Sequence, residues 1–413
     1  MEPCNYVIIG AGQAGCRAAI ALRDADPDGR IILIGAEPHL PYERPALSKG
    51  VLTGAVSPQS IIIKKKEQLD KFAIETHLGH SVEQINLGKR KVVLDDGRSF
   101  RFDKLMLATG SRVRRLTVSG VELPHIYSLR TVDDCMALSK RLAECRHLVV
   151  VGAGFIGLEV AASARQRFGC EVTAVESGAG VLQRGAPDEL RTSIYTLHRS
   201  KGIKFLFGDV VSAFEGNGII ERVVLTSGKI LHTDCVVIGI GVIPETDLAA
   251  RAGLEVKDGI VVDDFGETSQ PGIFAAGEVT NHLNCFLKTT VRIESWQIAQ
   301  NQSVVAANNM CGLGSSYNEI PWFWTDHFDN NFQLIGDTGS TLKRVTRLYG
   351  EVLQSTTFYI DKGIIVGALC INSGKDIRLV REAIRRGINI TQEQLADPTI
   401  KLKLHLTPHS VQA

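Results

Sequence analysis

Apolar residues along the first forty positions follow the order strand, turn, helix, strand. A β-branched run at residues 7–9 leads into a turn that holds three glycines, namely Gly10, Gly12 and Gly15. A helical stretch continues to about residue 22, and a second apolar run at residues 31–34 is followed by the acidic Glu37. This order predicts a βαβ unit in which the glycine turn opens the helix.

The same order occurs a second time. The apolar run at residues 148–151 leads into a turn whose glycines are Gly152, Gly154 and Gly157. A helix from residue 158 and an apolar run at residues 172–175 follow, and the run ends on Glu176. Because two complete units are very unlikely to arise by chance in one chain, the sequence predicts two dinucleotide sites.

Three shorter apolar runs, at residues 105–110, 236–241 and 272–278, end in turns that contain glycine. The first ends with Thr109 and Gly110, the second with Gly241 and the third with the acidic Glu278. Such turns can bring a bare backbone against a cofactor at the carboxyl end of a sheet. The third run lies too far along the chain to belong to the second unit. We therefore expect the second domain to be inserted into the first.

From about residue 321 the pattern changes to short strands separated by turns. Strands are predicted at residues 333–336, 344–348, 355–360 and 364–370, with a hairpin turn at residues 361–363. Ser373 is expected to be the N-cap of a helix over residues 375–386, which stops at Gly387. These elements predict a separate α+β domain.

Together the patterns predict an α/β protein of three domains. Two are Rossmann-like dinucleotide-binding domains, the second inserted in the first, and the third is the C-terminal α+β domain. The expected boundaries are residues 1–112 and 246–320 for the first domain, 113–245 for the second and 321–413 for the third. A length of 413 residues suits this number of domains.

Composition places the chain among ordinary soluble proteins, because 44% of its residues are hydrophobic and 22% are charged. Its 46 basic and 45 acidic residues leave a net charge of +1, so no overall field would hold a nucleic acid. The apolar stretch at residues 148–164 contains three glycines and Glu159. It therefore fits a buried strand and helix better than a membrane span.

Cysteine and histidine carry no recognisable chemistry in this sequence. The nine cysteines form no CxxC pair and no cluster with histidine at metal-ligand spacing, which favours reduced thiols, no metal and a cytoplasmic protein. None of the 11 histidines stands in a catalytic pattern, so none is assigned a role. The N-terminal segment shows neither a secretory signal nor a transit peptide.

The glycine turns imply nucleotide chemistry. In each, the first glycine permits the tight turn, the second lets backbone N–H groups approach a pyrophosphate, and the third lets the helix lie close to the strand. Glu37 and Glu176 stand where a carboxylate can accept hydrogen bonds from ribose hydroxyls. Because residues 177–182 offer no arginine to a 2′-phosphate, we expect the second site to prefer NADH over NADPH.

Several further segments carry a resemblance that extends over essentially the whole chain. They are LPYERPALSK at residues 40–49, GIGV at 239–242, AAGE at 275–278, VRIESW at 291–296 and PWFWTD at 321–326. With the two glycine turns, these segments resemble the FAD- and NADH-dependent ferredoxin reductases of bacterial oxygenase systems. That family includes the putidaredoxin, biphenyl-dioxygenase and phenylpropionate-dioxygenase reductases.

The resemblance implies one set of residues for each cofactor. The residues for FAD are Gly10, Gly12, Ala14, Gly15, Glu37, Arg44, Lys49, Val82, Thr109, Gly110, Arg130, Glu278 and Trp296. The residues for NADH are Gly152, Gly154, Ile156, Gly157, Glu159, Glu176 and Gly241. It also implies catalytic roles for three residues: Lys49 beside the flavin and paired with Glu159, and Trp324 near the isoalloxazine.

Two positions depart from the family pattern. Glu278 stands where the family nearly always has aspartate, and Pro45-Ala46 replaces a pair of prolines. The glutamate side chain is longer by one methylene, and we still expect it to reach a ribityl hydroxyl.

The function that the resemblance implies is electron transfer from NADH through FAD to a [2Fe-2S] ferredoxin. That ferredoxin would supply an aromatic-ring dioxygenase or a cytochrome P450. A flavin suits this task because nicotinamide gives two electrons as hydride, whereas an iron–sulfur centre takes one at a time. A cationic Lys49 would favour negative charge on the reduced flavin.

Two other functions use the same fold. Disulfide reductases and thiol-dependent NADH oxidases or peroxidases need a redox-active cysteine near the flavin, and residues 41–52 contain none. An NAD(H)-sensing flavoprotein of the apoptosis-inducing type usually carries targeting or basic nuclear-binding segments, and none is seen here. The sequence disfavours the first of these functions, and turnover with an added ferredoxin would separate a reductase from the second.

A docking surface for an acidic ferredoxin is expected on the C-terminal helix. Arg378, Arg381 and Arg385 are spaced by three and four residues, which places them on one helix face. A solvated helix face without a partner is the competing interpretation. A second basic cluster, at Arg112, Arg114 and Arg115, lies between the two nucleotide units. The identity of the ferredoxin and the choice between monomer and homodimer stay open.

Overall fold

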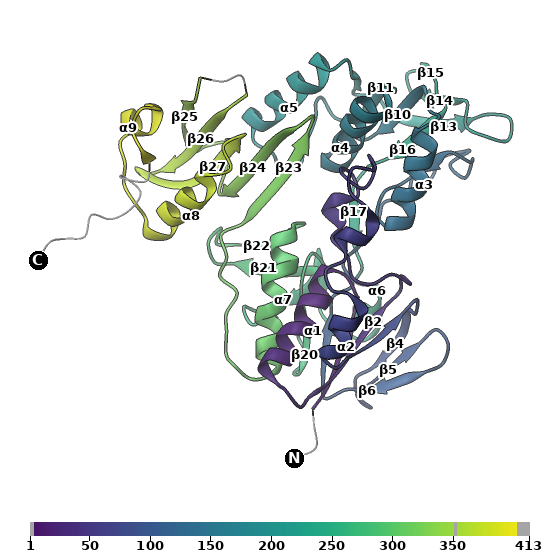
Figure 1. Ribbon diagram of the computed structural model, residues 1–413, viewed down its shortest axis with the longest axis vertical. Helices are drawn as coiled ribbons and strands as arrows, with labels where there is room; N and C mark the ends of the chain where they lie inside the picture. Colours follow the sequence, from purple (N-terminus) through teal and green to yellow (C-terminus); the bar gives the residue numbers. More distant parts are fainter. Residues whose placement is uncertain (1–3, 351–352, 403–413) are drawn as a thin grey trace, which may run out of the picture. The chain divides into compact units, whose positions relative to one another are not determined.

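The structure is a computed structural model that describes residues 4–350 and 353–402 (Figure 1). The chain divides into two compact units. The first contains the chain up to Pro45, Ser57–Arg112 and Val242–Glu319. The second contains Ala46–Val56, Val113–Gly241 and the chain from Ile320.

The first unit is built around a five-stranded parallel sheet of order β20-β7-β1-β2-β3. Its strands are β1 (Asn5–Ile9), β2 (Arg30–Gly35), β3 (Ile74–Leu78), β7 (Lys104–Leu107) and β20 (Ile273–Ala275). Helix α1 (Gln13–Ala25) packs along helix α7 (Trp296–Met310), as Figure 1 shows. Strand β20 follows the second glycine turn in sequence, which confirms that the second nucleotide fold is inserted in the first.

Both faces of this sheet are buried. Ile8 and Leu33 pack with α1 on one face, whereas Val7, Ile32 and Leu105 pack on the other. Successive strand residues point to opposite faces, so a strand covered on both sides must be apolar throughout. This is why the runs in β1 and β2 are continuous and do not alternate with polar residues.

The remaining elements of the first unit are short. Antiparallel strands β4 (Val82–Asn86), β5 (Lys91–Leu94) and β6 (Ser99–Arg101) form one sheet. A second small sheet contains β18 (Val256–Lys257), β19 (Gly259–Val262), β21 (Thr280–Asn284) and β22 (Thr289–Val291). The helices are η2 (Pro58–Ile61), α2 (Lys66–Lys71) and α6 (Asp247–Arg251). Near the unit boundaries in the sequence lie η1 (Arg44–Ala46), β8 (Ser111–Val113) and β17 (Val242–Pro244).

The second unit repeats the parallel arrangement, with the order β12-β11-β10-β16-β9. Its strands are β9 (Ile126–Tyr127), β10 (His147–Val151), β11 (Glu171–Glu176), β12 (Lys204–Phe207) and β16 (Cys235–Ile238). Its helices are α3 (Val132–Leu142), α4 (Phe155–Ser163) with the π turn η3 (Ala164–Phe168), and α5 (Asp188–Ser200). An antiparallel sheet holds β13 (Val211–Glu215), β14 (Arg222–Leu225) and β15 (Ile230–His232).

The C-terminal part of the second unit is an antiparallel sheet of order β23-β24-β27-β26-β25. The strands are β23 (Trp322–His327), β24 (Asn330–Gly336), β25 (Lys343–Leu348), β26 (Ser355–Asp361) and β27 (Ile364–Ile371). Two helices follow, α8 (Asp376–Arg386) and α9 (Gln392–Ala396). The four predicted strands are present, and β23 is a fifth strand that the apolar pattern did not predict.

The predicted N-cap of α8 is wrong. Lys375 occupies that position and makes no side-chain cap bond within the described part of the chain. Ser373 is 1% exposed, and its hydroxyl donates to the carbonyl of Ser355 at 2.7 Å. The neighbouring strand therefore uses the hydroxyl that was expected to cap the helix. The predicted stop at Gly387 is confirmed, because this glycine has a left-handed φ of 60°.

The unit boundaries fall close to the breaks expected near residues 112 and 246. They differ from the prediction in two respects. Ala46–Val56 belongs to the second unit, and residues 113–241 group with the chain from Ile320. The division into three domains therefore stays a prediction.

The apolar stretch that contains Glu159 forms strand β10 and helix α4, as the sequence predicts. Across residues 4–350 and 353–402, no helix combines the length and the apolar character that crossing a membrane requires.

Candidate functional site

The first glycine turn follows β1, the central strand of its sheet. Gly10 has a φ of 110°, and a Cβ atom there would overlap the carbonyl oxygen of Ala108. A Cβ at Gly15 would overlap the carbonyl of Gly10 itself. At Gly12, by contrast, no atom of the described residues lies within 4 Å of an added Cβ. The outer glycines are therefore required by the fold, while the middle one borders open space.

The start of α1 suits a pyrophosphate. Gly12 is the N-cap, and among the described residues no side chain caps this helix and no acid lies in its first turn. A helix N-terminus of this kind presents backbone N–H groups and a positive dipole end to an anion. The geometry therefore fits the diphosphate of FAD.

Charged residues gather in the same unit around Arg44. The Glu37 carboxylate accepts hydrogen bonds from the Arg44 guanidinium and from the Tyr42 hydroxyl. Burial alone would lower the pKa of Arg44, but Tyr42, Glu37 and Glu278 raise it above its ordinary value. The two predicted acids, Glu37 and Glu278, thus act on one predicted cation.

Two further predicted positions border the first turn. A Cβ at Gly277 would lie 3.1 Å from the Cβ of Ala14, so the AAGE segment before Glu278 packs against the start of α1. After β7, the Thr109 hydroxyl donates to the Glu245 carbonyl at 2.8 Å, and the Glu245 N–H donates to Gly110 at 2.8 Å.

The structure gives the positions of the other residues that are expected to contact FAD. Trp296 begins α7 after the N-cap Ser295, and Val82 begins β4 and packs against the core. Arg130 belongs to the second unit, where its backbone N–H donates to Asp134 at 3.0 Å. Their contacts with the cofactor stay predictions.

The second glycine turn follows β10 and repeats the geometry of the first. Gly152 has a φ of 101°, and an added Cβ would clash with the carbonyl of Gly239 at the end of β16. The nearest atom to a Cβ at Gly154 is 3.9 Å away, and Ile156 is 47% exposed. Within the described residues no side chain caps α4. This turn also fits a dinucleotide.

Glu176 lies directly at the second turn. One carboxylate oxygen accepts the Ala153 N–H at 2.8 Å, and the other accepts the Gly178 N–H at 2.8 Å. Arg184 is a residue that sequence reasoning missed. Its guanidinium donates to the Ile240 carbonyl at 3.2 Å and lies beside Gly241. The sequence gives no signal for this contact, because the partners are 56 residues apart and no motif joins them.

The ion pair between Lys49 and Glu159 that the resemblance implies is present in the second unit. Lys49 Nζ lies 3.0 Å from Glu159 Oε1, and Glu159 is 4% exposed. Thr325 donates to the same oxygen at 2.6 Å, and Ser48 donates to Oε2. Asp326 lies 3.6 Å from Lys49 Nζ. A buried carboxylate requires partners of this kind to offset its lost hydration.

Two buried histidines extend this group. His327 Nε2 lies 2.9 Å from the Thr325 hydroxyl, and His327 Nδ1 lies 3.1 Å from Nε2 of His198. Burial, and to a smaller extent the charge of Lys49, lowers the pKa of His327 to about 3, although a hydrogen bond with the Leu158 backbone acts in the opposite direction. Burial also holds the pKa of His198 well below its ordinary value. The sequence assigned these histidines no role, because spacing does not reveal contacts across the fold.

Trp324 forms part of an aromatic stack. Its ring lies 5.0 Å from that of Trp322 at an interplanar angle of 24°, and the Arg381 guanidinium lies 5.8 Å from the Trp322 ring. Trp324 directly precedes Thr325 on β23. Its expected place near the flavin ring stays a prediction.

The cysteine nearest to the first glycine turn is not activated. Cys16 is fully buried in α1, and burial raises its pKa to about 11. A thiol of this kind is a poor nucleophile at neutral pH. Cys16 therefore offers no activated thiol beside this turn.

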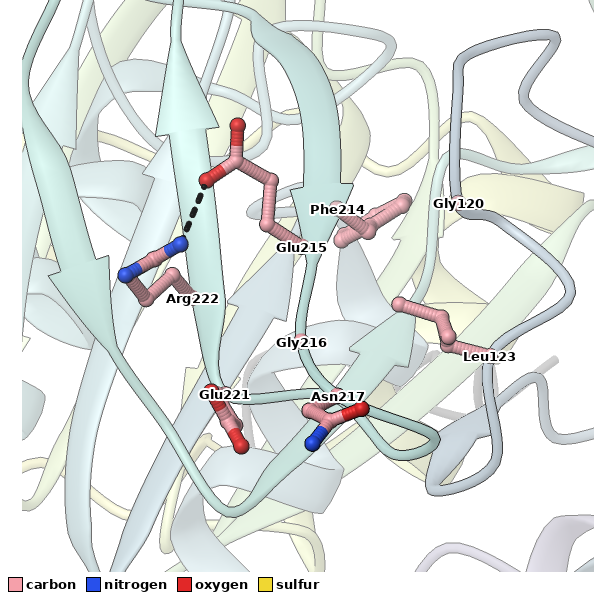
Figure 2. A pocket seen from close by; sticks show the side chains of 8 residues that line it. All are labelled: Gly120, Leu123, Phe214, Glu215, Gly216, Asn217, Glu221 and Arg222. Carbon is pink, nitrogen blue, oxygen red and sulfur yellow. Dashed lines mark ion pairs between the residues drawn. The ribbon is translucent and has the colours of Figure 1, made fainter.

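A surface hollow of about 550 Å³ lies beside β13 and β14, and Figure 2 shows the Glu215–Arg222 ion pair at its wall. The residues that line it are Gly120, Leu123, Phe214, Glu215, Gly216, Asn217, Glu221 and Arg222. None of them is a predicted site residue.

Two complete dinucleotide turns in one chain define an oxidoreductase with two nucleotide cofactors. Residues 4–303 match the family model for pyridine nucleotide-disulphide oxidoreductases, and residues 322–406 match the reductase C-terminal model. The chain is 42% identical to the anthranilate 1,2-dioxygenase system ferredoxin–NAD(+) reductase component of Burkholderia cepacia, over 98% of this chain and 100% of that protein.

Solved structures agree with this class. The ferredoxin reductase for the CYP199A2 system from Rhodopseudomonas palustris superposes with a TM-score of 0.93 at 35% identity, over 98% of this chain and 100% of that chain. The reductase in the covalent putidaredoxin reductase–putidaredoxin complex gives 0.91 at 31% identity, over 97% of both chains. The chain therefore belongs to the ferredoxin–NAD(+) reductases of the pyridine nucleotide-disulphide oxidoreductase family, whose cofactors are FAD and NAD(H).

Substitution of the glycines should separate the fold from FAD binding. We expect Gly12→Val to keep the fold but lose most bound FAD, because its side chain enters the open space beside the helix N-terminus. Gly15→Val should destabilise the unit, because it overlaps backbone. The measurements are flavin absorbance per chain and thermal unfolding by circular dichroism. Gly88→Val, on the surface of the same unit, is the control. Full flavin in Gly12→Val would contradict the assignment.

The buried histidines should make stability depend on pH. The folded pKa of His327, about 3, lies below the ordinary value of 6.5, so the unfolded chain binds more protons between these values. Stability is therefore complete above about pH 6.5 and falls by about 1.4 kcal/mol per pH unit below it. We expect His327→Gln to flatten the change in urea-unfolding free energy between about pH 5 and pH 7. His232→Gln, at an exposed site, should leave the slope unchanged. An equal slope in both variants would contradict the assignment.

Proposed function

We propose that the protein passes electrons from NADH through FAD to a [2Fe-2S] ferredoxin, which supplies an oxygenase. The observation that carries this proposal is the pair of dinucleotide turns, each placed after the central strand of a parallel sheet. The related proteins support the choice of acceptor. One is a component of a dioxygenase system, another serves a CYP199A2 system, and a third is joined to putidaredoxin.

The two cofactors are assigned to the two turns. The α1 N-terminus, Glu37 and Arg44 hold FAD, with Glu278 as a further polar contact. The second turn and Glu176 hold NADH, and Arg184 adds a positive charge beside Gly241. FAD, when bound, accepts a hydride and releases electrons one at a time.

Lys49, Glu159 and Trp324 are proposed to act near the flavin. Lys49 supplies a positive charge whose position the buried Glu159 carboxylate determines. Positive charge held in place stabilises negative charge that develops beside it. The Trp322–Trp324 stack offers a rigid aromatic surface on β23.

Turnover with a protein acceptor tests this function. The purified flavoprotein should oxidise NADH rapidly only when an oxidised [2Fe-2S] ferredoxin is present, with two ferredoxins reduced for each NADH. Slow turnover with a long-lived complex of reduced flavin and NAD would favour the sensor alternative. Rapid hydrogen peroxide formation without ferredoxin would favour an NADH oxidase.

We propose α8 as part of the ferredoxin docking surface, and the structure refines the set of arginines. Arg378 and Arg385 are exposed, whereas Arg381 is half-buried against Trp322. In the second expected cluster, Arg112 is paired with Glu245 at 2.7 Å and with Asp247 at 3.4 Å. Arg378 and Arg385, which are exposed on one helix, are the proposed contacts with an acidic partner.

NADH should be preferred over NADPH by about tenfold or more in kcat/KM, because a 2′-phosphate would meet the Glu176 carboxylate. Glu176→Gln removes the charge at nearly constant shape and should reduce this preference. Glu171→Gln, an exposed change on the same strand, is the control. Steady-state kinetics with both nucleotides decides the point. Equal discrimination in all three proteins would exclude Glu176 from this role.

Reversing charge at Arg378 and Arg385 should raise the KM for ferredoxin and leave reduction of the flavin by NADH unchanged. The effect should weaken as the salt concentration rises above about 0.1 M, where the Debye length is about 10 Å. Arg199→Glu, an exposed site on α5, is the matched control. An unchanged KM in Arg378→Glu/Arg385→Glu would place docking elsewhere.

A further inference from the structure

A chain of hydrogen bonds leads from Glu159 into the interior of the second unit. It passes from Glu159 to Thr325 at 2.6 Å, to His327 at 2.9 Å and to His198 at 3.1 Å. All four residues are buried, with exposures of 4%, 0%, 1% and 0% respectively. They come from α4, β23 and α5, so three elements meet at this chain.

The direction of each hydrogen bond follows from the atoms involved. An ion-paired carboxylate can only accept, so the single hydroxyl proton of Thr325 points to Glu159. The Thr325 oxygen must then accept from His327, which places a proton on His327 Nε2. Since a contact between two ring nitrogens needs one donor and one acceptor, His327 Nδ1 accepts from His198 Nε2.

We propose that His327 and His198 are positioning residues, each neutral with its proton on Nε2, and that together they hold the Thr325 hydroxyl on Glu159. The chain thereby fixes the carboxylate that orients Lys49. The consequence for the flavin rests on the proposed function, which places Lys49 beside that cofactor.

The need for positioning comes from two carboxylates that compete for Lys49. Its ammonium lies 3.0 Å from Glu159 and 3.6 Å from Asp326, which is 37% exposed. Lysine is a compact charge on a flexible stem, so a weaker hold on Glu159 would let it shift toward Asp326. Thr325 and Lys49 bind the same oxygen, Oε1. Loss of the hydrogen bonds from His198 and His327 to Thr325 would therefore change the position of the oxygen that pairs with Lys49.

The far end of the chain indicates that it holds charge in place and does not conduct protons. His198 Nδ1 is buried and has no hydrogen-bond partner among the described residues. The rings of Phe328 and Phe205 lie 5.1 Å and 6.4 Å from that of His198. Two charged groups act on the histidine pair, Glu159 through Thr325 and Lys49. Burial lowers the pKa of both His198 and His327, which agrees with neutral imidazole rings at neutral pH.

Nuclear magnetic resonance on the FAD-loaded protein with ¹⁵N-labelled histidine tests the tautomers. We expect two histidines with a protonated Nε2 and a bare Nδ1, unchanged between about pH 6 and pH 8. Their signals are assigned by their loss in His198→Asn and His327→Gln. An Nδ1–H tautomer or an imidazolium at either position would overturn the proposal. This measurement does not depend on activity.

The midpoint potential of bound FAD tests the positioning role. His327→Leu should lower the potential, because the positive charge of Lys49 is held less firmly. His327→Gln should restore it, because its amide can donate to Thr325 and accept from His198. His282→Leu, a buried histidine in the first unit, is the matched control and should have no effect. If His327→Leu fails to fold, Thr325→Val removes the central link instead.

A double-substitution comparison separates this inference from the proposed function. Lys49→Ala should lower the potential, and adding His327→Leu should lower it no further. A shift from His327→Leu that persists without Lys49 would overturn the positioning role, as would failure of His327→Gln to restore the potential. If Lys49→Ala leaves the potential unchanged, the role of Lys49 at the flavin is wrong, whereas the tautomer measurement still decides the hydrogen-bonded chain.

Discussion

The close approach of two backbone segments at the end of a central strand is the constraint on which both units depend. Gly10 lies against the carbonyl of Ala108, and Gly152 lies against that of Gly239. A side chain at either glycine would push neighbouring strands apart. Because these contacts are kept, each following helix begins at the edge of its sheet with its N-terminus open to an anion. The open anion-binding end of each helix thus depends on how tightly the strands can pack.

A second constraint organises the interior of the second unit. Glu159 is a buried charge on an otherwise apolar helix, and it is stable there because Ser48, Lys49 and Thr325 surround it. These partners come from two separate parts of the chain, residues 48–49 and Thr325. The carboxylate therefore connects residues 48–49 and strand β23 to the nucleotide fold of the second unit. It also makes the stability of the unit depend on a proposed catalytic residue.

Local patterns predicted most of the fold, because each glycine turn and each buried strand is determined by its own short sequence. The two dinucleotide turns were found in this way. Contacts between distant parts of the chain were not predicted. Nothing in the sequence indicates that Arg184 lies beside Gly241 or that His198 contacts His327. Ser373 was wrongly predicted as an N-cap. A serine before a helix commonly caps it, but here the Ser373 hydroxyl donates to the Ser355 carbonyl on a neighbouring strand. Strand β23 was missed because its aromatic and polar residues do not alternate.

The separation of the Glu159 partners along the chain has a consequence for synthesis. Ser48 leaves the ribosome 111 residues before Glu159, and Thr325 follows 166 residues after it. A nascent chain must therefore wait for β23 before this carboxylate has its full set of donors. Contacts of such long range slow folding and leave a partly folded chain exposed to misassembly. The C-terminal sheet is thus the last piece that completes the second unit, and a chain that ends before it would carry a buried charge with too few partners.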